Sequence, residues 1–342
     1  MLARCFLRKS LGLALVAWFV AGLAPPSIAA NAPARAEIPV KRVLMPNGIA
    51  RYTVDITVNG IGPIPALLDT GSTGLIVMAG VIEAKRFAKT GTFYDTFSSG
   101  EKMSGIMTQG RIGLGGLDTG VPIRFGSIQT VTCIAARPKC SAALLKPKDY
   151  AIAGDGIAGA GFKAILGIGL DHFFLPNPLV GAGANTWIVR LPQAGKSDGA
   201  IIINPTLADL DGFKRYPVSR ESFHQLGAFR ASVPGCLVSP ATGLNLCGQV
   251  ALDTGTPGVF AQVPDLPAAA SVHAPQRYSL NLFEGAGRLE IPIEETWNTR
   301  RIVYFERTTK TTTAAINAGA APYLSYLVFY DYRNNQVGLK PR

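Results

Sequence analysis

The sequence LLDTGS at residues 67–72 recurs almost unchanged as ALDTGT at residues 251–256, and these two stretches decide how the rest of the chain is interpreted. In each, an apolar strand end runs into Asp-Thr-Gly, then a hydroxyl residue, then more apolar chain. One copy lies in each half of the 342-residue sequence. Two carboxylates held in this way, Asp69 and Asp253, can share one proton and activate a water molecule between them.

A third Asp-Thr-Gly occurs at residues 118–120 and shows that the tripeptide alone does not identify a catalytic aspartate. It has neither the hydroxyl residue in the fourth position nor an apolar strand before it. Such a short motif arises by chance and usually marks a turn. We interpret it as a loop between strands, and Asp69 and Asp253 as the candidate catalytic pair.

The first 30 residues have the features of a signal peptide. A basic start is followed by an apolar run at residues 11–24 and by small residues that predict cleavage near Ala29 or Ala30. A retained membrane anchor is the alternative, but the run is shorter than the ~20 apolar residues of a spanning helix. We expect an exported protein, periplasmic or secreted, with no stable membrane span after cleavage.

The cysteines fit export. Cys5 leaves with the signal peptide, and the other four cysteines allow three disulfide connectivities. Because an oxidising compartment favours disulfides, we expect the local pairs Cys133–Cys140 and Cys236–Cys247. A zinc site is a weak alternative, since none of the three histidines is spaced to share one with these cysteines, and no metal or organic cofactor is implied. We treat the histidines as structural or surface residues: His172, His224 and His273.

The net charge is +11, but Lys and Arg occur singly or in pairs and no basic run alternates with aromatic residues. This distribution indicates a solvated surface and no nucleic-acid partner, with contact to anionic wall polymers left open. Short period-two runs such as residues 51–58, and 38 Gly and 24 Pro between them, predict an all-β chain. Its length suffices for two domains.

The two motifs and their surroundings resemble the pepsin-like aspartic proteases along nearly the whole mature sequence. Four further segments match the family in order, namely residues 98–106, 165–169, 197–203 and 326–339. The resemblance implies an all-β, bilobal fold with two related β-barrel-like lobes around a central cleft. It divides the chain into a signal peptide (1–30), an N-terminal lobe (31–190) and a C-terminal lobe (191–342). The Gly- and Ala-rich composition of an exported chain suggests a bacterial member.

The resemblance also implies the reaction, which is hydrolysis of a peptide or unfolded protein by the Asp69/Asp253 pair. Gly71 and Gly255 let the two loops approach closely. In the family, the hydroxyls at Thr70 and Thr254 lock the loops together, and those at Ser72 and Thr256 donate to the outer carboxylate oxygens. Because such donors stabilise the ionised form, we expect an acidic pH optimum. Which aspartate holds the proton is left open.

The flap is where the sequence departs from the family. Phe97, Ser99 and Gly100 fall in the expected flap hairpin, but Phe97 and Ile76 replace the usual Tyr and Trp. The crossing element of the second lobe has one weak candidate, at residues 317–319. The rival interpretation is a non-catalytic pepsin-like protein that binds a peptide, glycan or protein. A monomer is expected in either case.

Overall fold

The computed structural model describes residues 34–83, 87–97, 99–171, 174–219, 222–223, 228–229, 231–264, 278–282, 289–293, 303–307 and 313–342. Contacts divide the chain into Met1–Asn31 and Ala32–Arg342, and all that follows concerns the second unit. The predicted signal peptide and the three histidines lie outside the described residues. Within the described ranges, no helix has both the length and the apolar character to cross a membrane.

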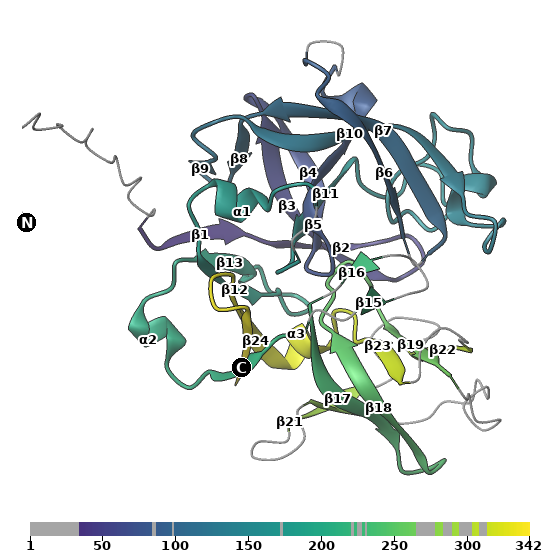
Figure 1. Cartoon of the computed structure of the whole chain (residues 1–342), viewed down its shortest axis with the longest axis vertical. Coiled ribbons are helices and arrows are strands. Elements are labelled where there is room, and N and C mark those ends of the chain that lie inside the picture. The colour runs from purple at the N-terminus through teal and green to yellow at the C-terminus, as the bar shows by residue number, and fades with distance from the viewer. Residues whose placement is uncertain are drawn as a thin grey trace, which may run out of the picture. The chain divides into compact units, whose positions relative to one another are not determined.

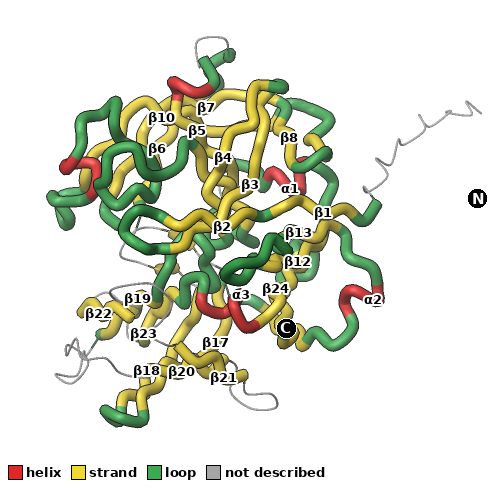
Figure 2. The backbone as a smooth tube through the Cα atoms, turned by 180° about the vertical axis from the view of Figure 1, so that it is seen from behind, coloured by secondary structure: helices red, strands yellow, loops and turns green. Residues whose placement is uncertain are grey.

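Strands dominate the described chain, as Figure 2 shows, which confirms the all-β prediction. The alternating apolar runs form the strands, and the Gly- and Pro-rich stretches between them form turns. The helical elements are single turns: α1 (Pro178–Gly181), α2 (Leu207–Leu210), α3 (Ala321–Ser325), η1 (Ala79–Val81) and η3 (Ser141–Leu144).

The first half of the chain builds a ten-stranded sheet. Its strand order is β6-β7-β10-β5-β11-β4-β3-β8-β9, and β2 pairs with β3. The strands are β2 (Lys41–Leu44), β3 (Ala50–Val58), β4 (Ile61–Asp69), β5 (Thr73–Met78), β6 (Gly91–Thr96), β7 (Glu101–Gly110), β8 (Ile112–Leu114), β9 (Leu117–Asp118), β10 (Ile123–Cys133) and β11 (Ala164–Ile168).

The second half builds a seven-stranded sheet in the order β21-β20-β17-β18-β23-β19-β22. Its strands are β17 (Ser232–Ser239), β18 (Leu244–Ala251), β19 (Val259–Val263), β20 (Tyr278–Leu282), β21 (Leu289–Ile293), β22 (Val303–Arg307) and β23 (Ala314–Asn317).

A six-stranded sheet joins segments from both ends of the described chain, in the order β1-β13-β12-β24-β25-β14. A separate hairpin pairs β15 with β16. The strands are β1 (Ala36–Pro39), β12 (Thr186–Arg190), β13 (Ala200–Ile203), β14 (Lys214–Pro217), β15 (Ser222–Phe223), β16 (Ala228–Phe229), β24 (Tyr326–Asp331) and β25 (Gln336–Pro341). The lobe boundary at residue 190 stays a prediction.

The two halves repeat one local arrangement around their Asp-Thr-Gly loops, and Figure 1 shows β4, β5 and β11 together in the first. There β11 lies between β4 and β5, parallel to β4 and antiparallel to β5. In the second half β23 lies in the same way between β18 and β19. Residues 317–319, the weak candidate for the crossing element, therefore do lie at its end, and Asn317 is the last residue of the crossing strand β23.

Both expected disulfides are present. Cys133–Cys140 closes a loop after β10, and Cys236–Cys247 joins the paired strands β17 and β18. The sheets pack around a continuous apolar cluster with Trp187 and Tyr323 among its largest fully buried side chains. Because such interiors are close-packed, this core holds the two Asp-Thr-Gly loops in fixed positions.

Candidate active site

Asp69 ends β4, where the strand turns into the loop that leads to β5. Asp69 is buried, at 7 % exposure. The backbone N–H of Gly71 donates to Asp69 Oδ1 at 2.8 Å, and the Ser72 hydroxyl donates to Oδ2 at 2.6 Å. The loop therefore supplies two donors to its own carboxylate, as the sequence predicted for Ser72.

Asp253 follows β18 and is built in the same way, at 2 % exposure. The N–H of Gly255 donates to Asp253 Oδ1 at 2.9 Å, and the Thr256 hydroxyl donates to Oδ2 at 2.9 Å. The two carboxylates thus have matching donors at matching positions. The chance repetition of a tripeptide would not produce this symmetry.

Four hydrogen bonds through two threonines tie the loops together. The N–H of Thr70 donates to Thr254 Oγ1 at 3.1 Å, and the N–H of Thr254 donates to Thr70 Oγ1 at 3.0 Å. The Thr70 hydroxyl donates to the carbonyl of Leu252 at 2.9 Å, and the Thr254 hydroxyl donates to that of Leu68 at 2.8 Å. Each threonine side chain therefore grips the backbone just before the opposite aspartate.

The glycines explain how close the loops come. A Cβ added to Gly71 would lie 2.4 Å from Asp253 Cγ, and one added to Gly255 would lie 2.8 Å from Asp69 Cγ. Each glycine therefore lies against the carboxyl group of the other loop, where no side chain fits. Asp69 and Asp253 are brought to one site by this packing.

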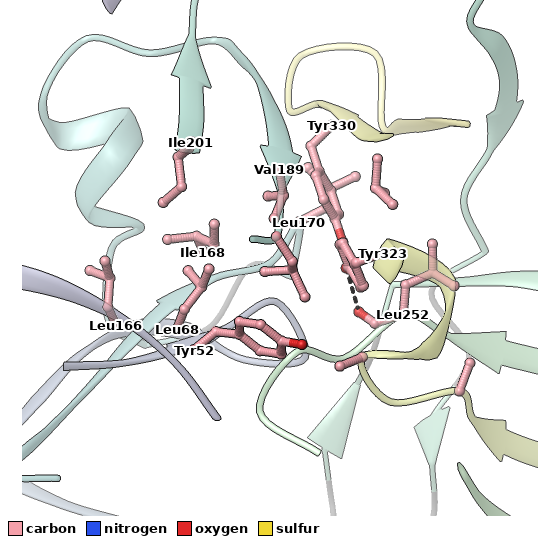
Figure 3. Packing of buried hydrophobic residues seen from close by; sticks show 14 of the residues in the cluster. Tyr52, Leu68, Leu166, Ile168, Leu170, Val189, Ile201, Leu252, Tyr323 and Tyr330 are labelled. Carbon is pink, nitrogen blue, oxygen red and sulfur yellow. Dashed lines mark hydrogen bonds between the residues drawn. The ribbon is translucent and has the colours of Figure 1, made fainter. Parts of the chain in front are cut away.

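Two buried tyrosines stand behind the threonines, and Figure 3 shows their rings meeting at their hydroxyls. The Tyr323 hydroxyl lies 2.7 Å from Thr70 Oγ1, and it hydrogen-bonds the Tyr330 hydroxyl as well. The Tyr323 hydroxyl also lies 3.3 Å from the carbonyl of Leu252, so the hydroxyls of Thr70, Tyr323 and Tyr330 form one buried hydrogen-bond network. Burial raises the pKa of both tyrosines, so both stay neutral. No motif in the sequence predicts this pair.

Asn317 at the end of β23 adds a further donor. Its Nδ2 donates to Asp253 Oδ2 at 2.5 Å and to Thr256 Oγ1 at 3.2 Å. Its Oδ1 accepts the N–H of Gly319 at 2.9 Å, which fixes the orientation of the amide. The sequence indicates this residue only as part of the candidate crossing element and predicts no part for it in the chemistry.

Both carboxylates face one cleft of about 440 Å³, lined by residues from both halves of the chain. Arg51 of β3 lies in its wall and is buried. Its Nη1 donates to the carbonyl of Gly255 at 2.9 Å, and its Nη2 pairs with Asp155 at 3.1 Å. Burial lowers the pKa of Arg51, while Asp155 opposes that change. A strand pattern alone could not show that this arginine faces the aspartates.

The predicted flap is a hairpin of β6 and β7. Phe97 and Ser99 line the cleft, and Gly100 takes a φ of +102° in the turn, which favours glycine. Phe97 packs against the apolar cluster that contains Ile76, which agrees with an apolar replacement of the family's Tyr and Trp. Tyr94 is 67 % exposed and lies under Lys102, so it does not take the place of the missing Tyr.

The third Asp-Thr-Gly lies apart from the cleft. Asp118 ends the two-residue strand β9 and pairs with Arg111 at 2.9 Å, and the Thr119 hydroxyl serves the local turn. Thr119 and Gly120 lie in the loop between β9 and β10, as expected, whereas Asp118 is the last residue of β9. Among the described residues, no group of three or more His, Cys, Asp or Glu side chains is arranged to hold a metal ion.

Comparison with known proteins supports the fold. No family model matches the sequence, and no curated protein matches it. Among solved structures, the chain is similar to the aspartic proteinase from Irpex lacteus, with a TM-score of 0.57 and 14 % sequence identity. The match covers 90 % of this chain and 97 % of that one. The predicted bilobal, pepsin-like all-β fold is therefore confirmed, and the identity is low enough that the likeness shows the fold alone.

Proposed function

We propose that this protein is an exported aspartic endopeptidase in which Asp69 and Asp253 hydrolyse peptide bonds through an activated water. The observation that carries the proposal is the matched pair of donor-supported carboxylates, one from each half, at the floor of one cleft. The two disulfides are consistent with an oxidising destination, periplasmic or extracellular.

The chemistry follows from two carboxyl groups that compete for one proton. Such groups cannot both ionise cheaply, so in acid one is charged and the other is protonated. The charged carboxylate takes a proton from water as the oxygen attacks the peptide carbonyl, and the protonated one donates to the carbonyl oxygen. Collapse of the resulting diol passes a proton to the departing amide nitrogen. No metal or nucleophilic serine is required by this sequence of steps.

The lining of the cleft supports an extended peptide as the substrate. The cleft is lined by the apolar side chains of Leu67, Ile165 and Met103 and by the flap residue Phe97. An extended peptide could place apolar side chains against these residues while its carbonyl group approaches the dyad. We therefore propose a peptide or unfolded protein as the substrate of a monomeric enzyme.

The test is cleavage of an unfolded protein by the chain from residue 31, between pH 3 and pH 7. We expect cleavage in acid, inhibition by a statine-type transition-state analogue, and a loss of about 10²–10⁴-fold in Asp69→Asn. Asp118→Asn, in the third Asp-Thr-Gly, is the matched control and should keep full activity. If the well-folded protein cleaves nothing at any pH, the non-catalytic binding interpretation takes its place.

A further inference from the structure

The dyad is symmetric in its loops but asymmetric in the crossing strands behind them. β11 pairs Leu67 with Ile165, two residues before Asp69. β23 pairs Ala251 with Asn317, two residues before Asp253. Ile165 and Asn317 are therefore equivalent positions, and one has an apolar side chain while the other has an amide.

The side-chain amide of Asn317 donates a hydrogen bond to the carboxylate of Asp253. Asn317 is buried, and its Nδ2 lies 2.5 Å from Asp253 Oδ2, which also accepts the Thr256 hydroxyl. Its other end is held by the N–H of Gly319, so the amide cannot turn away without losing a second bond. A donor aimed at a carboxylate oxygen stabilises the ionised form more than the neutral one, because charge-assisted hydrogen bonds are the stronger kind.

We propose that Asn317 is a positioning residue that keeps Asp253 ionised and leaves the shared proton on Asp69. Asp253 then takes the proton from the attacking water, and Asp69 protonates the carbonyl oxygen. As the C–N bond breaks, Asp253 passes its proton to the nitrogen, and Asp69 recovers a proton from the diol. The inference rests on the proposed function, since it assigns the two roles within that reaction.

Other charged and titratable groups also surround Asp253. Arg51 donates to the neighbouring Gly255 carbonyl and is itself paired with Asp155. Tyr323 and Tyr330 lie behind the loops, with their pKa values raised by burial. None of these groups differs between the wild-type protein and a variant at position 317. A change in the pH profile of such a variant therefore reports the lost donor. The charged and titratable groups that surround Asp253, and that these variants leave unchanged, are Asp69, Arg51, Asp155, Tyr323 and Tyr330.

The experiment compares kcat/KM across pH 2.5 to 7 for wild type, Asn317→Leu and Asn317→Ala. Leucine has the branching of asparagine without its polar atoms. Alanine also removes the donor to Asp253 and adds no group that titrates. Without the donor, ionisation of the dyad is harder, so in both variants the acid limb should move up by about one pH unit. At a pH well below the acid limb, kcat/KM should fall roughly tenfold as a result.

Ile316→Val is the matched control, since it removes one methylene from the adjacent buried residue of β23 and should leave the limb in place. If the acid limb of the kcat/KM profile lies at the wild-type pH in both position-317 variants, the inference is overturned, even if their activity falls. Asn317 would then only stabilise the conformation of the loop. If one variant fails to fold, the other still decides. An inactive wild-type protein would instead count against the proposed function itself.

Discussion

At the scale of single residues, the hydrogen bonds that join the two Asp-Thr-Gly loops are supported by tyrosine hydroxyls from a distant part of the sequence. The Tyr323 hydroxyl hydrogen-bonds the Thr70 hydroxyl, which also accepts from and donates to the second loop. The Tyr330 hydroxyl completes this buried chain. The first loop is therefore supported by the C-terminal segment, far away in sequence.

Replacing Tyr323 by Phe should lower the free energy of unfolding by about 1–3 kcal/mol, because a buried hydrogen bond is lost and Tyr330 loses its partner. The melting temperature should fall by several degrees. Thermal unfolding measures this directly. Tyr304→Phe is the control, since Tyr304 is 39 % exposed and stacks on Phe260, and it should change the melting temperature little. Equal melting temperatures for Tyr323→Phe and wild type would contradict the account.

At the scale of elements, the loop closed by Cys133–Cys140 reaches from the first half of the chain to the second. Arg137 in this loop pairs with Glu306 of β22 at 3.1 Å, and its guanidinium lies 5.7 Å from the ring centre of Phe260 in β19. Arg137 and Phe260 both line the cleft. The arginine thus connects two walls of the proposed substrate site.

Arg137→Ala should weaken substrate binding without disturbing the dyad. We expect KM to rise several-fold while kcat stays within a factor of about two, since interactions that are equal in the ground and transition states affect KM alone. Steady-state kinetics on a peptide substrate separates the two constants. Glu306→Gln should show the same pattern more weakly, because Arg137 keeps its contact with Phe260. A kcat that falls in step with kcat/KM would show that Arg137 acts on the chemistry.

At the scale of the whole molecule, strand β1 pairs with β13 at the edge of the six-stranded sheet. Arg35, the residue before β1, attaches this strand to α2 through an ion pair. Arg35 pairs with Asp209 of α2 at 2.8 Å. The hydrogen bond from Arg35 is the largest cause that holds the pKa of Asp209 well below its ordinary value. The N-terminal strand is therefore fastened by a group that stays charged in acid.

Asp209→Asn tests this fastening. Because the pKa of Asp209 is depressed in the folded state, its stabilisation is present above the unfolded value near pH 3.9 and is lost as the pH falls through the folded value. The difference in melting temperature between wild type and variant should be constant from pH 7 to about pH 5 and shrink below pH 4. The pair is partly exposed, so the difference should be small and should decrease with added salt. A difference that grows toward low pH would contradict the assignment.

How much the sequence could predict also differs with scale. The aspartates and their hydroxyl partners were predictable because each set lies within four consecutive residues and occurs twice. The local disulfides were predictable for a similar reason. Arg51, Arg137, Asn317 and Tyr323 were not, because each reaches the site from a strand, loop or helix distant in sequence, and only the sheet topology brings them together. The lobe boundary and the signal peptide remain predictions.

The central claim is that Asp69 and Asp253 form one site for a tetrahedral intermediate. The most direct test is calorimetric titration of the mature protein with a statine-type inhibitor at pH 4, beside Asp69→Asn and Asp253→Asn. The account predicts one inhibitor bound per chain, and at least about a hundredfold weaker binding in each variant, since transition-state analogues depend on the catalytic groups. If the well-folded variants bind the inhibitor as tightly as wild type, the hydroxyl of the statine group does not lie between these two carboxylates. That result would contradict the claim.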